Sequence, residues 1–242
     1  MICSLKKFTR LYNDNSVSVF GKKGRGKDML TANIIARRRK KRYYISNVDY
    51  KLKNKIYIPL NFSKLRCDNM YKNFINGDIN AFYYCYPDNT DIYISDCGIY
   101  FPSQYNNELN RDYKDIPTFM ALSRQLGNCF VHTNAQALNR VWDKIREQSD
   151  IYISCVRCKV FFKKIVVQTV YVYEKYDSAQ CNVPPLRLKM PLNKVARANV
   201  AIEKERYRIQ YGEIKKYTFI YRNRSKYDTR LFKSILEGNL CP

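Results

Sequence analysis

The sequence predicts an α/β fold with a mainly parallel sheet covered by helices, and three observations favour it. A β-prone run at residues 16–20 ends at a glycine and leads into residues 27–39, where apolar side chains recur at helical spacing. β-prone and helical segments then alternate as far as residue 150, which is typical of a parallel sheet covered on both faces. The 242 residues are 45% hydrophobic and 27% charged, which is the composition of a globular protein with a real core.

The other elements follow in chain order and change character after residue 150. Up to that point we expect strands at 43–48, 55–58, 91–95 and 129–133, and helices at 69–81, 115–127 and 135–148. Beyond it, the runs 151–162 and 165–173 predict a hairpin, 181–192 a proline-containing linker, and 193–205 and 226–238 two helices. We therefore expect a core at 1–150 and a β-hairpin and helical extension at 151–242, as a separate unit or as part of the same domain.

Charge is the unusual feature of the composition. Lys and Arg number 44 against 21 acidic residues, a formal net charge of +23, which attracts polyanions. Nucleic acid is the first candidate partner and an anionic membrane surface the second. No apolar run of about 18 residues and no amino-terminal signal is found, so we expect a cytoplasmic protein without a transmembrane segment. Nine scattered cysteines fit reduced thiols.

The most specific motif is a glycine-rich loop at residues 21–28. Its sequence GKKGRGKD has the spacing G-x-x-x-x-G-K, with a carboxylate where Ser or Thr normally follows. Glycines let successive N–H groups turn inward around phosphates, and the following helix adds positive potential at its amino end. This predicts a P-loop NTPase that binds ATP and Mg²⁺. The candidate nucleotide-binding residues are Gly21, Lys22, Lys23, Gly24, Arg25, Gly26, Lys27, Asp28 and Met29.

A magnesium site needs a second carboxylate at the end of a neighbouring strand, and Asp96 has that position. We expect Asp28 and Asp96 to hold Mg²⁺, with the hydroxyl of Thr31 as a weaker substitute. Many related ATPases place a glutamate next, but this chain continues with Cys97 and Gly98. A carboxylate on the following segment, Glu108 or Asp112, could replace it, and the residues alone do not choose between them.

Polar side chains after the strand at 129–133 have two readings. Asn134 and Gln136 could sense a γ-phosphate at the carboxyl edge of the sheet, or residues here could cap a helix. Arg140 and Arg146 could act across a subunit interface as arginine fingers, or lie on a solvated helix face. Lys27, Asp96, Gln136 and Arg146 are therefore the candidate catalytic residues.

A basic run follows the loop helix. Its members Arg37, Arg38, Arg39, Lys40, Lys41 and Arg42 could contact nucleic-acid phosphates or complement the helix carboxyl terminus. Two other chemistries have little support. Cys155 and Cys158 have the spacing of a zinc pair but lack a second pair, and His132 is the one histidine, which we expect to pack beneath the sheet.

Residues 17–151 resemble the Zot-like family of phage assembly ATPases, named after zonula occludens toxin, within the FtsK–HerA group of DNA-pumping motors. The resemblance rests on GKKGRGKDMLT, YYISN, ISDCG and the long run that begins ALSRQLGNCFVHTNAQ. Residues that match the family pattern are Arg124, Gly127, Gln136, Asp143 and Arg146. Members commonly carry a membrane-spanning segment after the ATPase domain, and none is found here.

The resemblance implies an ATP-driven translocase that packages or extrudes phage DNA in the host cytoplasm. It also implies a ring-like homo-oligomer, with DNA in a basic central channel and viral structural proteins as further partners. The alternative is an assembly protein that binds nucleotide and DNA with little or no hydrolysis, which the missing glutamate and Asp28 favour. A small-molecule kinase is a third class, against which the net charge of +23 argues.

Overall fold

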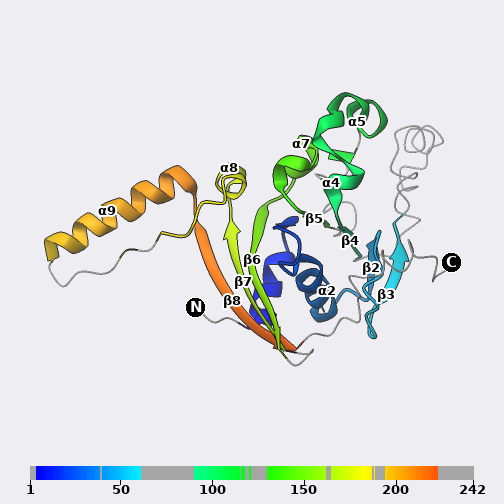
Figure 1. Ribbon diagram of the computed structural model, residues 1–242, viewed down its shortest axis with the longest axis horizontal. Coiled ribbons are helices and arrows are strands. Elements are labelled where there is room, and N and C mark those ends of the chain that lie inside the picture. The colour runs from blue at the N-terminus through cyan, green and yellow to red at the C-terminus, as the bar shows by residue number, and fades with distance from the viewer. Residues whose placement is uncertain are drawn as a thin grey trace.

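The computed structural model describes residues 4–38, 40–60, 90–114, 116–117, 120, 130–161, 165–186, 188 and 194–222. Their centre is an eight-stranded sheet of order β3-β2-β4-β5-β1-β6-β7-β8 (Figure 1). The strands are β1 (Val17–Phe20), β2 (Tyr43–Ser46), β3 (Ile56–Pro59), β4 (Asp91–Ile94), β5 (Val131–Ala135), β6 (Ile151–Phe161), β7 (Ile165–Tyr173) and β8 (Ile214–Arg222). The α-helices described are α1 (Leu5–Phe8), α2 (Lys27–Arg37), α4 (Cys97–Tyr100), α5 (Asn106–Asp112), α7 (Asp143–Arg146), α8 (Tyr176–Gln180) and α9 (Lys194–Tyr211). Short 3-10 turns are η1 (Thr9–Tyr12), η3 (Ser103–Tyr105) and η4 (Leu138–Arg140).

The sheet has a parallel part and an antiparallel part that meet at β6. In the order β3-β2-β4-β5-β1-β6, each strand pairs in parallel with its neighbour, as crossover connections through helices require. From β6 the chain folds back twice, so β6, β7 and β8 form an antiparallel meander. The predicted α/β class and the hairpin are confirmed. The meander continues the same sheet, and the domain boundary at residue 150 stays a prediction.

Each face of the sheet carries its own core. On one face, α1 and α2 pack Leu5, Phe8, Leu30 and Ile34 against the inner side of β1, β6, β7 and β8. On the other, the segments around α4, α5 and α7 pack against β2, β4 and β5, and α8 packs near the start of β6. The strand residues alternate between these two cores, as the period of a pleated strand requires.

The predicted helix at 135–148 is wrong. β5 extends to Ala135, and the chain then makes the η4 turn and an extended stretch before the four residues of α7. Val141 bridges Pro102, and the Trp142 N–H donates to the Phe101 carbonyl at 2.8 Å. Because the indole of Trp142 is fully buried, tertiary packing overrides the helical spacing of the local sequence.

Other expectations differ in smaller ways. β8 lies at 214–222, where no element was expected, and α9 runs to Tyr211, beyond the predicted end at 205. α9 extends away from the sheet as an arm (Figure 1). The predicted helices at 69–81 and 226–238, and most of that at 115–127, lie outside the described residues. No helix of the described part is both long and apolar enough to cross a membrane.

A buried charge cluster forms where β4 begins. Asp91 accepts from Arg38 at 2.9 Å and from Lys41 at 3.1 Å, and all three side chains are nearly excluded from solvent. Nε2 of His132 lies 3.8 Å from the carboxylate, while its Nδ1 accepts from the Val17 N–H at 3.2 Å. Burial by itself would raise the pKa of Asp91, but His132, Arg38 and Lys41 together lower it. Burial lowers the pKa of His132, so the ring is neutral, and it packs within the sheet as expected.

This cluster corrects part of the nucleic-acid prediction. Arg38 and Lys41 belong to the basic run, yet both are buried against Asp91 and cannot reach a phosphate. Lys40 and Arg42 are exposed, and Arg37 is partly buried with its guanidinium over the Tyr221 ring. Arg39 lies outside the described residues. Nucleic-acid contact stays a prediction for the rest of the run.

Replacing Asp91 tests the cluster as a fold determinant. Asp91→Asn leaves two buried cations without their counter-charge, which should lower the free energy of unfolding by about 3–5 kcal/mol. The control is Glu213→Gln, which removes the partner of the exposed Lys215 at 2.7 Å and should cost under about 1 kcal/mol. Urea denaturation followed by circular dichroism measures both, and equal losses in the two variants would contradict a structural role for the buried cluster.

Candidate phosphate-binding site

The glycine-rich loop joins β1 to α2 and has the backbone that its sequence requires. Gly24 and Gly26 take left-handed φ angles of 78° and 76°, which glycine adopts without steric cost. The Arg25 N–H donates to the Lys22 carbonyl at 3.2 Å, and the Leu30 N–H donates to the Gly26 carbonyl at 2.9 Å. The loop is therefore a closed turn that passes directly into the helix.

The start of α2 is open to an anion. No side chain caps this helix end, so its first N–H groups keep their donor capacity. A Cβ placed on Gly24 would meet nothing within 4 Å, so there is free space over the loop. Lys27 lies in the first turn, while Lys22 and Lys23 are exposed. Open amides, free space and a lysine are the features that a phosphate chain requires.

Strand β7 holds the loop from behind through Gln168. Its Nε2 donates to the carbonyls of Arg25 at 3.2 Å and Gly26 at 3.1 Å, and its Oε1 accepts from the Tyr221 hydroxyl at 2.7 Å. All three polar groups of the Gln168 and Tyr221 pair are thus used inside the protein, where unpaired groups would be costly. The sequence motifs did not predict a role for Gln168, although a glutamine at an inward position between Val166 and Val170 is a signal for such a role.

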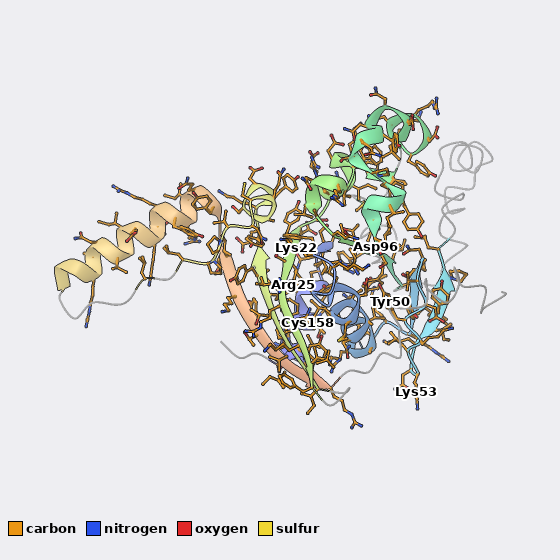
Figure 2. The ribbon with its side chains drawn as sticks, in the orientation of Figure 1. Lys22, Arg25, Tyr50, Lys53, Asp96 and Cys158 are labelled. Carbon is orange, nitrogen blue, oxygen red and sulfur yellow. The ribbon has the colours of Figure 1, made fainter. Side chains whose placement is uncertain are left out.

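Strand β6 approaches the loop so closely that only glycine fits. A Cβ on Gly21 would lie 2.7 Å from the Cys155 carbonyl oxygen, and one on Gly26 would lie 2.7 Å from Sγ of Cys158. Figure 2 shows Cys158 beside the loop that carries Arg25. A bulge between Cys155 and Arg157 shifts the register of β6, and both thiols join the core behind the loop. The two cysteines of β6 therefore pack directly against the loop and leave no room for side chains at Gly21 and Gly26.

Asp28 is fixed by the ends of two neighbouring strands. Its Oδ1 accepts from the Ser95 hydroxyl at 2.8 Å and from Nδ2 of Asn134 at 3.3 Å. Asn134 in turn accepts from the Thr31 hydroxyl at 3.1 Å. Ser95 exchanges two hydrogen bonds with Asn47, at 2.7 and 2.9 Å. Asn134, expected as a sensor or a cap, is thus placed beside Asp28, and Thr31 contacts Asp28 only through it.

Asp96 completes an acidic pair with Asp28. It follows β4 in the left-handed region, with φ 48° and ψ 45°, a conformation that aspartate tolerates better than most residues. Burial first and the charge of Asp28 second raise its pKa, and Lys27 opposes them. Two carboxylates beside a phosphate loop supply the oxygen ligands that Mg²⁺ prefers, and the charge of the ion would offset the repulsion between them. Metal binding by this pair stays a prediction.

The position after Asp96 holds no base. The Cys97 side chain is fully buried, and burial raises the pKa of its thiol, so it neither accepts nor donates a proton at neutral pH. Glu108 and Asp112 lie on α5, where Asp112 pairs with Arg111 at 2.9 Å. The choice between these two carboxylates stays open.

Two other candidates lie apart from the loop's contacts. Gln136 is exposed just after β5. Arg146 donates to the Val141 carbonyl at 3.1 Å and lies 5.0 Å over the Tyr176 ring, so it is held within its own chain. Arg140 is exposed on η4, and Arg124 and Gly127 lie outside the described residues. Catalytic roles for Gln136 and Arg146 stay predictions.

A glycine-rich loop that joins the first strand of a mainly parallel sheet to the following helix is the arrangement of the P-loop NTPase fold. No family model and no curated protein matches this chain. Among solved structures it is similar to the amino-terminal domain of zonular occludens toxin from Neisseria meningitidis, with TM-score 0.43 and 12% identity over 90% of this chain and 96% of that one. It is also similar to the DNA-packaging ATPase from Sulfolobus turreted icosahedral virus, with TM-score 0.40 and 14% identity over 58% and 75%. A third is EssC (ATPases 2 and 3) from Geobacillus thermodenitrificans, with TM-score 0.43 and 13% identity over 93% and 42%. The function is inferred from the site itself.

Two glycine variants test the contact between the loop and β6. Gly24→Ala and Gly26→Ala impose the same left-handed strain, about 1 kcal/mol, but only Gly26→Ala also meets the Cys158 thiol. We expect Gly26→Ala to lower the free energy of unfolding by a further 1–3 kcal/mol or so. Urea denaturation measures the difference. Cys158→Ala should recover part of it in the Gly26→Ala background, because it removes Sγ at 2.7 Å but leaves Cβ at 3.0 Å. Equal effects of the two glycine variants would show that the contact is not tight.

A second prediction concerns pH and Asp96. Because the pKa of Asp96 is raised in the folded protein, the fold disfavours its charged form. Asp96 therefore destabilises the folded protein at pH 7, and this destabilisation is absent at low pH, where the carboxyl is neutral in both states. Asp96→Asn should therefore raise the free energy of unfolding at pH 7, and the gain should vanish as the pH falls below about 4, where the carboxyl is neutral too. Urea denaturation between pH 7 and pH 3 checks this. The exposed Asp14→Asn is the control, and a loss of stability in Asp96→Asn at pH 7 would refute the argument.

Proposed function

We propose that this protein is a P-loop ATPase that couples ATP hydrolysis to the movement of viral DNA during virion assembly in the host cytoplasm. The observation that carries the proposal is the uncapped start of α2, with a glycine turn before it and an acidic pair beside it. A phosphate chain requires the first part and a divalent cation the second.

Each residue has a defined task in this proposal. The loop amides and Lys27 bind the phosphates and neutralise their charge, and bound Mg²⁺ supplies electrostatic stabilisation of the transferred group. Asp28 and Asp96 are the metal ligands, with Asp28 oriented by Ser95 and Asn134. Gln136 is the proposed sensor at the edge of β5, and Arg146 or Arg140 would complete a neighbour's site in a ring. Gln168 binds no nucleotide and fixes the loop's carbonyls instead.

The DNA partner and the role in virion assembly are inferred from the charge of the chain and from its sequence motifs. A net charge of +23 favours a polyanionic partner. The motifs that resemble the Zot-like family supply the assembly role, the ring and the viral structural partners.

One observation favours a second candidate, an assembly protein that binds ATP without useful turnover. The residue after Asp96 is a buried thiol in place of a glutamate, so no base orients water at that position. The two candidates share the nucleotide site and differ only in hydrolysis.

ATP hydrolysis with and without DNA separates them. We expect turnover that single- or double-stranded DNA stimulates and that Lys27→Ala lowers at least about a hundredfold, because the lysine contacts the transferred phosphate. Lys53→Ala, at an exposed lysine between β2 and β3 and outside the loop, is the control and should keep most of the activity. A phosphate-release assay at fixed salt measures both variants.

Each result has a clear meaning. Tight ATP binding without hydrolysis under any condition would reject the motor and favour the second candidate. No ATP binding at all, or equal losses in the two lysine variants, would reject the nucleotide site itself.

A further inference from the structure

The antiparallel meander has an outer face that no described helix covers over most of its length. Its inner face carries Val166, Gln168 and Phe219 into the core with α1 and α2. The neighbouring side chains point the other way, as strand geometry requires. On this outer face α8 packs only near the residues that begin β6 and end β7. Figure 1 shows the outer side of β8 below the α9 arm without a helix against it.

The register defines which residues share this face, because directly paired residues point to the same side. Arg157 pairs with Thr169, and Thr169 pairs with Thr218, whose hydroxyl lies 3.3 Å away. We name the surface the outer β-face. Its residues are Arg157, Lys159, Phe161, Ile165, Val167, Thr169, Tyr171, Lys216, Thr218, Ile220 and Arg222.

The charge on the outer β-face is of one sign and ordered. The three strands contain no Asp or Glu. Arg157 and Lys159 lie along β6, and Lys216 and Arg222 lie along β8. Between them, every outward residue of β7 is uncharged. Two cationic borders therefore flank a neutral strip.

Exposed apolar surface accompanies these cations. Phe161 is 45% exposed, Ile165 44% and Ile220 55%, so water contacts large side chains on a face that also repels itself electrostatically. Phe161 lies on β6, Ile165 on β7 and Ile220 on β8, so the apolar side chains are interspersed with the cations. A partner that carries both phosphates and flat apolar groups would contact both kinds of side chain. Bases that stack on aromatic or aliphatic side chains, with phosphates on Lys and Arg, have this chemistry.

We propose that the outer β-face binds single-stranded nucleic acid, with phosphates on its Lys and Arg side chains and bases on the exposed apolar side chains of the three strands. A duplex hides the faces of its bases and would leave these apolar side chains uncovered. The inference rests on the proposed function, since it names the place where the nucleic-acid partner is held. It moves the main contact from the basic run at residues 37–42 to the meander.

The same strand links this face to the phosphate loop. Gln168 points inward to the loop carbonyls, while its neighbours Val167 and Thr169 point outward to the proposed ligand. A nucleic acid that shifts β7 would shift the donor that holds Arg25 and Gly26. Binding on one side of β7 is thus coupled by direct contact to the loop on the other.

A matched pair of triple variants tests the proposal. The face variant is Arg157→Gln with Lys159→Gln and Lys216→Gln. The control is Arg10→Gln with Lys53→Gln and Lys204→Gln, which removes the same charge from exposed residues elsewhere. Lys53 lies in the segment between β2 and β3, away from the meander (Figure 2). Fluorescence anisotropy with a labelled single-stranded oligonucleotide, without ATP, gives the affinity at several salt concentrations.

We expect the face variant to bind about tenfold or more weakly at moderate salt. Its slope of log affinity against log salt should fall by about 2, because each lost contact to a single strand removes about 0.7. The control variant should keep the wild-type slope. Phe161→Ala should weaken binding with the slope unchanged, since stacking releases no counterions.

Three results would overturn the proposal. These are equal slopes for the face and control variants, a loss confined to anionic phospholipid vesicles, and a changed oligomeric state at unchanged nucleic-acid affinity. ATP titration separates this site from the proposed function. The face variant should bind ATP as the wild type does, and Lys27→Ala should lose ATP while it keeps the nucleic acid.

Discussion

The close packing of the phosphate loop on the meander is the constraint on which the rest of the site depends. Gly21 and Gly26 touch β6 at distances that leave no room for a side chain, and Gln168 of β7 binds the loop's carbonyls. A loop of left-handed glycines is costly in entropy when it is free, and these contacts hold it in one conformation. The antiparallel strands that follow residue 150 therefore pack against the phosphate loop and fix its conformation in the candidate nucleotide site.

Strand β4 shows how environment gives one residue type two roles. Asp91, just where the strand begins, is surrounded by Arg38, Lys41 and His132, which lower its pKa and make it a fixed anion of the core. Asp96, just beyond the other end, is partly buried beside Asp28, and its pKa is raised. The first arrangement stabilises the fold. In the second arrangement the carboxylates of Asp28 and Asp96 repel each other until a cation binds, so the binding site lowers the stability of the folded protein.

The parts of the fold that sequence could predict are those set by neighbours along the chain. The strand, loop and helix around Lys27 and the hairpin at 151–173 follow from local spacing and turn residues. The misses come from contacts between distant segments. Trp142 is held extended by Phe101, and Gln168 reaches the loop across 142 residues of chain. In the same way, the basic run reads as a solvated stretch until β4 brings a carboxylate against two of its members.

The meander also explains how one protein could couple two polyanions without a hinge. Alternation along β7 places Gln168 on the loop and its neighbours Val167 and Thr169 on the outer β-face, so no residue separates the two surfaces. A pleated strand held by two ladders moves as a unit, because a slip of one residue would exchange its faces. Tension on the outer β-face would therefore reach the loop as a small displacement of the whole strand. Gln168, with both ends hydrogen-bonded, is the element that would transmit it.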